Sequence, residues 1–215
     1  MMRLFIFDLD GTLLNTIADL ADSTNYALNQ YNWPTHPTES YRFFVGNGIH
    51  KLFERALPEG EKTPENISKI REQFLAYYSA HNMDRSEPYP GIPALLQTLH
   101  EKDIRLAVAS NKYQEATRKL VEHFFADIPF VAVFGQREGI APKPDPTIVE
   151  EILSIAGINR EETLYVGDSG VDMQTALNSG VTACGVTWGF RPRAELEQFN
   201  PAFIVDNPQE ILHII

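Results

Sequence analysis

Short apolar runs that end in polar residues recur along the chain. The first, Leu4–Phe7, stops abruptly at Asp8, and a glycine turn follows almost at once. Runs that are too short for helices and are bounded by turn residues are typical of buried β-strands. Further segments share this shape, the last of them weakly: 104–109, 130–134, 163–166, 182–186 and 203–205. We therefore predict a strand in each, with polar residues at its carboxyl end.

Helical periodicity separates these predicted strands. Apolar residues recur at helical spacing in four segments: 92–101, 114–124, 146–156 and 171–179. Several of these segments begin near Asp, Ser or Pro or end in Gly, which are typical helix boundaries. Strands that alternate with helices form βαβ units, whose strands are parallel. The predicted fold class is therefore α/β, with a doubly wound, mostly parallel sheet. We expect a final helix to begin near Pro208.

One stretch, from Thr16 to about residue 86, interrupts this alternation. It contains no convincing strand but has three helical patterns, at 17–31, 41–57 and 64–81. We interpret residues 16–86 as an inserted, all-helical domain. The α/β core would then comprise residues 1–15 and 87–215, and the chain would return to it through a segment rich in Pro and Gly.

Composition narrows the classes of function. The chain carries 18 Lys and Arg residues against 29 Asp and Glu, which gives a formal net charge of −11. Such a charge repels polyanions, so we expect neither nucleic-acid binding nor attraction to anionic membranes. No apolar run approaches the roughly 18 residues of a membrane span, and no targeting segment is evident, so we expect a cytoplasmic protein. The single cysteine, Cys184, lies in an apolar run and is predicted to be buried.

Ligands of open α/β sheets bind beyond the carboxyl ends of the strands. In this chain those positions, together with one lysine just ahead of a helix, hold Asp8, Asp10, Ser110, Asn111, Lys143, Asp168 and Asp172. Clustered carboxylates repel one another unless a cation joins them, and Mg²⁺ prefers oxygen ligands. The pattern therefore indicates a magnesium site at this edge of the sheet, although single Asp or Ser residues there could also cap helices.

The order and spacing of these residues resemble the four signatures of the haloacid dehalogenase-like superfamily. The matching segments are Asp8-Leu9-Asp10-Gly11-Thr12, Ser110-Asn111, Lys143-Pro144 and Gly167-Asp168-Ser169-Gly170-Val171-Asp172. The helical insert is similar to the domain that this family calls the cap. The resemblance implies a phosphatase in which Asp8 attacks phosphorus and forms an aspartyl-phosphate. Asp10 would protonate the leaving oxygen and then activate water.

The same resemblance implies a magnesium ion and the groups that hold it. The ligands would be the carboxylates of Asp8 and Asp168 and the backbone carbonyl of Asp10. Asp172 would act nearby, either as a direct or water-mediated ligand or by orienting the others.

It also implies the contacts to the phosphate. Thr12, the Ser110 hydroxyl and the backbone N–H at Asn111 would hold phosphate oxygens, and Lys143 would offset the charge between nucleophile and phosphate. One departure lies at the start of the insert, where many relatives have Asp-Ser and this chain has Asn15-Thr16. Details of cap closure therefore do not transfer from those relatives.

The most distinctive feature of the insert is Val45-Gly46-Asn47-Gly48. It resembles the cap loop of phosphoglycolate phosphatases, where glycines let backbone N–H groups approach the substrate, but a plain turn between helices would look alike. Arg42 and Lys51 flank it and could bind a second anionic group. We therefore expect a small phosphorylated metabolite as the substrate, with 2-phosphoglycolate the leading candidate.

Several alternatives share most of these residues. A dehalogenase needs no acid/base at the position of Asp10, so the presence of Asp10 argues for phosphate chemistry. Three alternatives on the same core remain open: a sugar-phosphate phosphatase, a sugar phosphomutase and a pyrophosphatase. Receiver domains, a non-enzymatic signalling class, also combine Asp, Ser or Thr, and Lys, but they are about half this length and have no helical insert. The loop Trp188–Arg191 follows the last clear strand and would either brace the insert or simply pack as an aromatic loop.

Overall fold

A six-stranded sheet forms the centre of the computed structural model, which describes residues 1–215. The strands run in the order β5-β4-β1-β6-β7-β8, and every neighbouring pair is parallel. Their bounds are β1 (Leu4–Phe7), β4 (Arg105–Tyr113), β5 (Phe130–Gln136), β6 (Thr163–Gly167), β7 (Thr182–Val186) and β8 (Phe203–Val205). The predicted α/β class and parallel sheet are confirmed.

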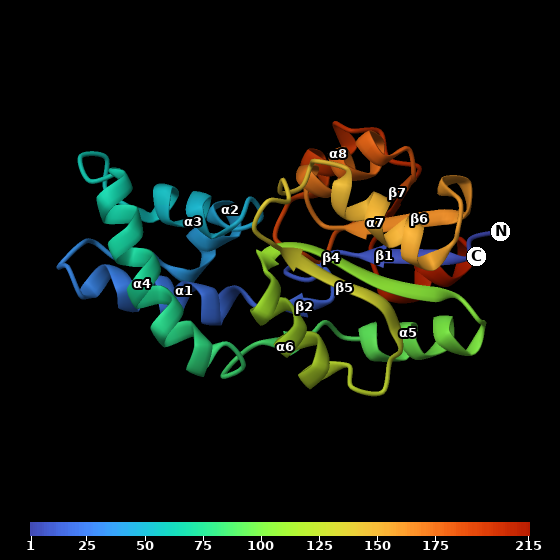
Figure 1. Cartoon of the computed structure of the whole chain (residues 1–215), viewed down its shortest axis with the longest axis horizontal. Helices are drawn as coiled ribbons and strands as arrows, with labels where there is room; N and C mark the ends of the chain where they lie inside the picture. Colours follow the sequence, from blue (N-terminus) through green and yellow to red (C-terminus); the bar gives the residue numbers. More distant parts are fainter.

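Helices cover both faces of the sheet (Figure 1). One face carries α5 (Ile92–Glu101) and α6 (Gln114–Phe124), and the other carries α7 (Thr147–Ala156) and α8 (Gly170–Ser179). Successive strand side chains point to opposite faces, so Phe5 and Phe7 pack with α5 and α6, whereas Leu4 and Ile6 pack with α7. This double burial explains why β1 is apolar at every position.

Two details of the carboxyl-terminal region differ from the prediction. The expected final helix is a 3₁₀ helix, η3 (Pro208–His213). A short helix, α9 (Arg193–Glu197), was not predicted. Cys184 is fully buried, as predicted, and burial raises the pKa of its thiol to about 12.

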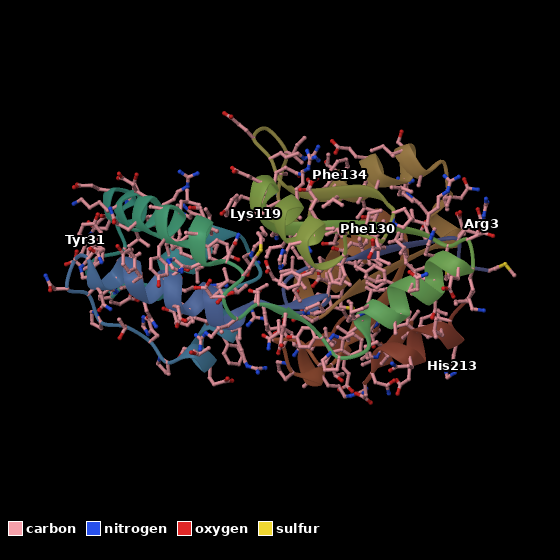
Figure 2. All side chains as sticks on the ribbon, turned by 90° about the horizontal axis from the view of Figure 1, so that it is seen from below. Arg3, Tyr31, Lys119, Phe130, Phe134 and His213 are labelled. Atoms are coloured by element: carbon pink, nitrogen blue, oxygen red, sulfur yellow. The ribbon has the colours of Figure 1, made fainter.

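The helical insert stands beside the carboxyl end of the sheet (Figure 1). It consists of α1 (Ile17–Asn29), η1 (Thr38–Ser40), α2 (Tyr41–Phe44), α3 (Ile49–Ala56) and α4 (Pro64–His81), with its own apolar core. Figure 2 shows Tyr31 at the far end of the insert, Arg3 at the opposite end of the molecule and Lys119 between them. No helix of the chain combines the length and apolarity needed to cross a membrane.

The predicted helix over 41–57 is wrong, because the structure divides it into α2 and α3. The break lies at Val45-Gly46-Asn47-Gly48, where Gly46 and Gly48 have φ values of 113° and 81°. A positive φ cannot continue a right-handed helix. Apolar residues keep helical spacing on both sides of the break, which is why periodicity alone suggested one helix.

Two short strands hold the ends of the insert together. Strand β2 (Leu14–Asn15) pairs antiparallel with β3 (Glu87–Pro88), so the outgoing and returning segments lie side by side. Beyond them, the buried carboxylate of Asp19 accepts hydrogen bonds from the backbone N–H groups of Arg85, at 3.0 Å, and Ser86, at 2.8 Å. These contacts fix where the insert begins, next to the loop that carries Asp8 and Asp10.

Candidate active site

A small cavity lies between the carboxyl edge of the sheet and the helical insert. The core side of its wall consists of Asp8, Asp10, Ser110, Asn111 and Lys112, and the insert side consists of Leu20, Val45, Gly46, Gly48, Ile49 and Leu52. The cavity has a volume of about 40 Å³, which is room for a few water molecules. One wall is therefore polar and charged, and the facing wall is mostly apolar.

Three buried carboxylates cluster around Asp8, which is the one of them that lines this cavity. Asp8, Asp168 and Asp172 are 8%, 2% and 1% exposed, and one oxygen of each lies within 4.8 Å of the others. Asp8 and Asp168 follow β1 and β6, which are paired neighbours with Phe7 opposite Val166, so both acids leave the sheet side by side.

Asp172 is placed by the first turn of α8. The Ser169 hydroxyl and backbone N–H both donate to Asp172 Oδ2, at 2.6 and 3.1 Å. Ser169 caps the helix in return, by accepting from the Asp172 backbone N–H. This reciprocal capping box fixes the acid locally, through a Ser and an Asp three residues apart.

Two glycines allow neighbouring loops to pack directly on Asp168. A Cβ at Gly11 or Gly189 would lie 2.4 or 2.3 Å from the nearest Asp168 atom. The carboxylate accepts the Phe190 N–H at 2.7 Å and the Thr12 hydroxyl at 3.3 Å. Thr12 is fully buried and does not line the cavity, so its side chain holds Asp168.

Lys143 is the cation at the centre of this cluster. Its Nζ lies 2.8–3.0 Å from four oxygens: Asp8 Oδ1, Asp172 Oδ1, Ala109 O and Tyr165 Oη. Burial alone would lower the pKa of Lys143, but the carboxylates of Asp172 and Asp8 raise it well above its ordinary value. The side chain therefore stays an ammonium.

Asn111 links the loop of Lys143 to the insert. Its Oδ1 accepts the Lys143 backbone N–H at 2.8 Å, and its Nδ2 donates to the carbonyls of Lys143 and Gly46 at 3.1 and 3.0 Å. One side chain thus joins the second and third sequence signatures to the glycine loop of the insert.

The donor set of the acid cluster fits a divalent cation. Burial, followed by the nearby charge of Asp172, raises the pKa of Asp8 to about 7, and burial also raises the pKa of Asp168 well above its usual range. Three carboxylates against the Lys143 ammonium leave two negative charges to balance. An all-oxygen set of this charge suits Mg²⁺. Both oxygens of Asp168 and of Asp172 already accept hydrogen bonds, whereas Asp8 Oδ2 accepts none within the protein and is the oxygen most free to bind a metal.

Mg²⁺ should therefore stabilise the fold, and more strongly at pH 8 than at pH 5.5. A pKa raised in the folded state means that protonated Asp8 stabilises the metal-free protein at low pH, and this contribution is lost as the pH rises through about 7. Calorimetry with Mg²⁺ about 100-fold above its Kd should show a Tm increase of roughly 5–10 °C at pH 8. Asp168→Asn should abolish most of the increase. An increase that is independent of pH and survives in Asp168→Asn would contradict a metal site here.

Asp10 is not part of the acid cluster and contacts a second lysine. Its carboxylate accepts from Lys112 Nζ at 2.9 and 3.1 Å and from the Thr16 hydroxyl at 2.6 Å. Thr16 occupies the position where the chain departs from many relatives, and it supplies a hydroxyl there. Lys112 was missed at the sequence level, although it directly follows Ser110-Asn111.

Three residues expected to contact substrate do not line the cavity. Arg42 pairs with Glu39 at 2.7 Å, Lys51 pairs with Glu54 at 2.6 Å, and Asn47 Oδ1 accepts from Arg55 at 2.9 Å. These residues are close to the glycine loop in sequence, but their side chains point to other partners and not into the cavity. Gly46 and Gly48, by contrast, do form part of the wall.

The loop Trp188–Arg191 joins the insert to the core. Arg191 donates to the Val45 carbonyl at 3.0 Å, and the Gly189 carbonyl accepts from Arg42 at 3.2 Å. The Trp188 indole N–H donates to the Thr12 carbonyl at 3.0 Å, which anchors the other end of the loop near the acid cluster. The loop therefore braces the insert, the first of the two roles considered for it.

Comparison with known proteins places this arrangement in a family. Residues 5–186 match the family model described as haloacid dehalogenase-like hydrolase. Curated proteins named phosphoglycolate phosphatase include one from Haemophilus influenzae, 32% identical over 99% of this chain and 98% of its own length, and one from Vibrio parahaemolyticus, 30% identical over 100% and 96%. A crystal structure of a predicted phosphoglycolate phosphatase from Haemophilus somnus superposes with a TM-score of 0.90 at 30% identity, covering 99% of this chain and 97% of that one. The chain belongs to the haloacid dehalogenase-like hydrolase family, and within it is phosphoglycolate phosphatase-like.

Proposed function

We propose that this phosphatase hydrolyses small phosphomonoesters through an aspartyl-phosphate on Asp8, with 2-phosphoglycolate as the leading substrate. The observation that carries the proposal is that two acids line one cavity, each with its own lysine. Asp8 and Asp10 both line it, yet Asp8 contacts Lys143 and Asp10 contacts Lys112. The two carboxylates thus have separate cations and can take separate roles.

In the first half-reaction, an Asp8 oxygen attacks phosphorus and the bond from phosphorus to the ester oxygen breaks. Asp10, which must then be protonated, gives its proton to the departing oxygen so that the product leaves as an alcohol. Lys143 Nζ, 2.9 Å from Asp8 Oδ1, orients the nucleophile and offsets its charge. Mg²⁺ bound by Asp8, Asp168 and the Asp10 carbonyl, with Asp172 nearby, would supply electrostatic stabilisation of the phosphoryl group.

In the second half-reaction, Asp10 takes a proton from water, and the water oxygen attacks the phosphorus of the aspartyl-phosphate. The bond between phosphorus and Asp8 breaks, which releases phosphate and restores both carboxyl groups. The insert forms one wall of the cavity, which limits the access of water to the intermediate.

Several hydrogen-bond donors are available for the phosphate oxygens. Ser110 lines the cavity; its Oγ accepts the Lys112 N–H, and its own proton has no acceptor in the protein. The backbone N–H groups of Leu9 and Asp10, next to the nucleophile, also donate to no backbone or side-chain acceptor. Thr12 contributes indirectly, by holding Asp168.

The wall contributed by the insert supports a small substrate with a second anionic group. The N–H groups of Gly46 and Gly48 have no protein acceptor, and Gly48 immediately precedes α3, where further N–H groups are unpaired. Leu20, Ile49 and Leu52 leave little space for a sugar ring. These features favour phosphoglycolate over sugar phosphates, in keeping with the names of the relatives.

A panel of phosphorylated compounds tests the substrate. With purified protein and Mg²⁺, kcat/KM for 2-phosphoglycolate should exceed that for glycerol phosphate, glucose phosphates and pyrophosphate by about tenfold or more, which corresponds to about 1.4 kcal/mol in transition-state stabilisation. A higher value for pyrophosphate or a sugar phosphate would favour one of those alternatives. Asp8→Asn serves as the blank for contaminating phosphatases.

The glycine loop should determine this selectivity. Gly48→Ala introduces a side chain where φ is 81°, so the loop must shift, although the new Cβ would meet only the Asn111 carbonyl, at 3.7 Å. We expect KM for phosphoglycolate to rise about tenfold, with a smaller change for p-nitrophenyl phosphate. Gly157→Ala, also at positive φ but in open space at the end of α7, is the matched control. Equal effects of the two variants would contradict a role of the loop in recognition.

A further inference from the structure

The two buried lysines of this site have different surroundings. Lys143 is held by the core whether or not the insert is in place, because Ala109, Tyr165 and Asp172 all accept from it. Lys112, whose side chain is 3% exposed, directs its hydrogen bonds to Asp10 alone. A buried ammonium without other acceptors is costly unless its one partner is a carboxylate. Lys112 and Asp10 are therefore matched to each other.

The backbone of β4 aims Lys112 at Asp10. The pairing of β4 with β5 shifts register between Ala109 and Tyr113, and the Lys112 N–H donates to Ser110 Oγ at 3.2 Å instead of continuing the ladder. Gly135 on β5 makes room for this irregularity, since a Cβ there would lie 2.4 Å from the Lys112 carbonyl. Bulges of this kind redirect side chains at functional sites.

The helical insert completes the surroundings of Lys112. Tyr78 of α4 is fully buried, and its ring centroid lies 5.0 Å from Lys112 Nζ. Thr16, the residue that leads into α1, donates to the same Asp10 carboxylate at 2.6 Å. Both segments of the insert that contact this pair therefore help to exclude water from it, which strengthens its electrostatic attraction.

We propose that Lys112 is a positioning residue for the reaction, which holds the Asp10 carboxyl group in place for proton transfer and does so fully only when Tyr78 covers it. This rests on the proposed role of Asp10 as acid and base. In the first half-reaction the Asp10 proton passes to the leaving oxygen, and the resulting carboxylate is the form that Lys112 binds. Because Lys112 donates to both carboxylate oxygens, it fixes the direction of the Asp10 carboxyl group for the transfer of that proton and for the approach of water.

The test compares two leaving groups. An alkyl phosphate such as glycerol phosphate needs a proton on its leaving oxygen, whereas p-nitrophenyl phosphate scarcely does. Lys112→Met should lower kcat/KM by about 10²-fold for the alkyl ester, the lower end of what proton transfer contributes, and by less than about fivefold for the aryl ester. Lys112→Arg should recover part of the loss. Lys119→Met removes an exposed lysine that also reaches α4, through the Ser79 carbonyl, and should change neither value.

A double-variant cycle separates positioning from other roles. If Lys112 acts through Asp10, Asp10→Asn with Lys112→Met should be no slower than Asp10→Asn alone. The proposal would be overturned if the losses of the two single variants multiplied in the double variant, or if Lys112→Met raised KM equally for both esters. Lys112 would then be a substrate-binding residue. If Lys112→Met fails to fold, Tyr78→Leu takes its place, and it should show a smaller loss with the same dependence on the leaving group. An equal loss of kcat/KM for both esters in Tyr78→Leu would overturn the proposal.

The same experiment keeps this proposal distinct from the proposed function. A parent enzyme that hydrolyses both esters, together with a Lys112→Met variant that does the same, overturns only the role of Lys112. A parent enzyme that hydrolyses neither these two esters nor 2-phosphoglycolate with Mg²⁺ overturns the phosphomonoesterase assignment, and the role of Lys112 with it.

Discussion

Replacing Asp8 with asparagine should reduce phosphatase turnover by about 10⁵-fold or more, because an amide is a far poorer nucleophile than a carboxylate. The fold should survive the change. Asp8 is one of three mutually repelling buried carboxylates, and its pKa of about 7 reports the cost of ionising it there. A neutral asparagine removes that cost, so the metal-free variant should be at least as stable as the parent at pH 8.

Trapping of the intermediate provides the measurement. Acid quenching during turnover of a radiolabelled phosphate ester should leave label on the parent protein, mapped to Asp8, and none on Asp8→Asn. Asp127→Asn makes the same Asp-to-Asn change at an exposed position on a remote loop, and it should leave both turnover and labelling unchanged. Turnover by Asp8→Asn within tenfold of the parent would refute the covalent mechanism.

Replacing Asp10 with asparagine should cost about 10²–10⁴-fold in turnover of alkyl phosphates, the range typical of lost proton transfer. The loss in kcat/KM should be much smaller for p-nitrophenyl phosphate, whose leaving group needs no proton. The substitution also leaves the Lys112 ammonium buried without a carboxylate, so we expect a destabilisation of about 3–5 kcal/mol.

The stability effect offers an independent check on Asp10. Combining Asp10→Asn with Lys112→Met removes both charges and should restore most of the lost free energy of unfolding without restoring activity. Denaturant unfolding of the single and double variants measures this. A uniform, small kinetic loss across leaving groups would show that Asp10 is only a structural partner of Lys112.

Much of the core followed from sequence because its determinants are local. The apolar runs that became β1, β4, β5, β6, β7 and β8 are short and end at polar residues, and helical segments separate them. Parallel strands bring their carboxyl ends to one edge, so Asp8 and Asp168 could be placed together before any coordinates were known. The capping of α8 by Ser169 likewise depends on residues only three positions apart.

The insert was less accessible to this reasoning. Its helices were expected, and Val45–Gly48 was interpreted as a loop or a turn between helices. The apolar pattern nevertheless ran on through 41–57 as one helix, because backbone dihedral angles leave no trace in apolar periodicity. The two-residue strands β2 and β3 are too short to give any pattern, and their pairing joins positions about seventy residues apart in the chain. Arg42 and Lys51 lie next to the glycine loop in sequence, yet both are paired with nearby glutamates on the surface.

What the sequence determined was therefore the order of elements and the identity of the acids, since both depend on spacing along one chain. What the tertiary structure decided was which side chains meet. Lys112 reaches Asp10 only because β4 leaves its ladder opposite Gly135, and Tyr78 covers the pair only because the carboxyl-terminal part of α4 reaches the core. Contacts of this kind depend on the direction of side chains from distant elements, which is fixed by packing and not by the local pattern of residues.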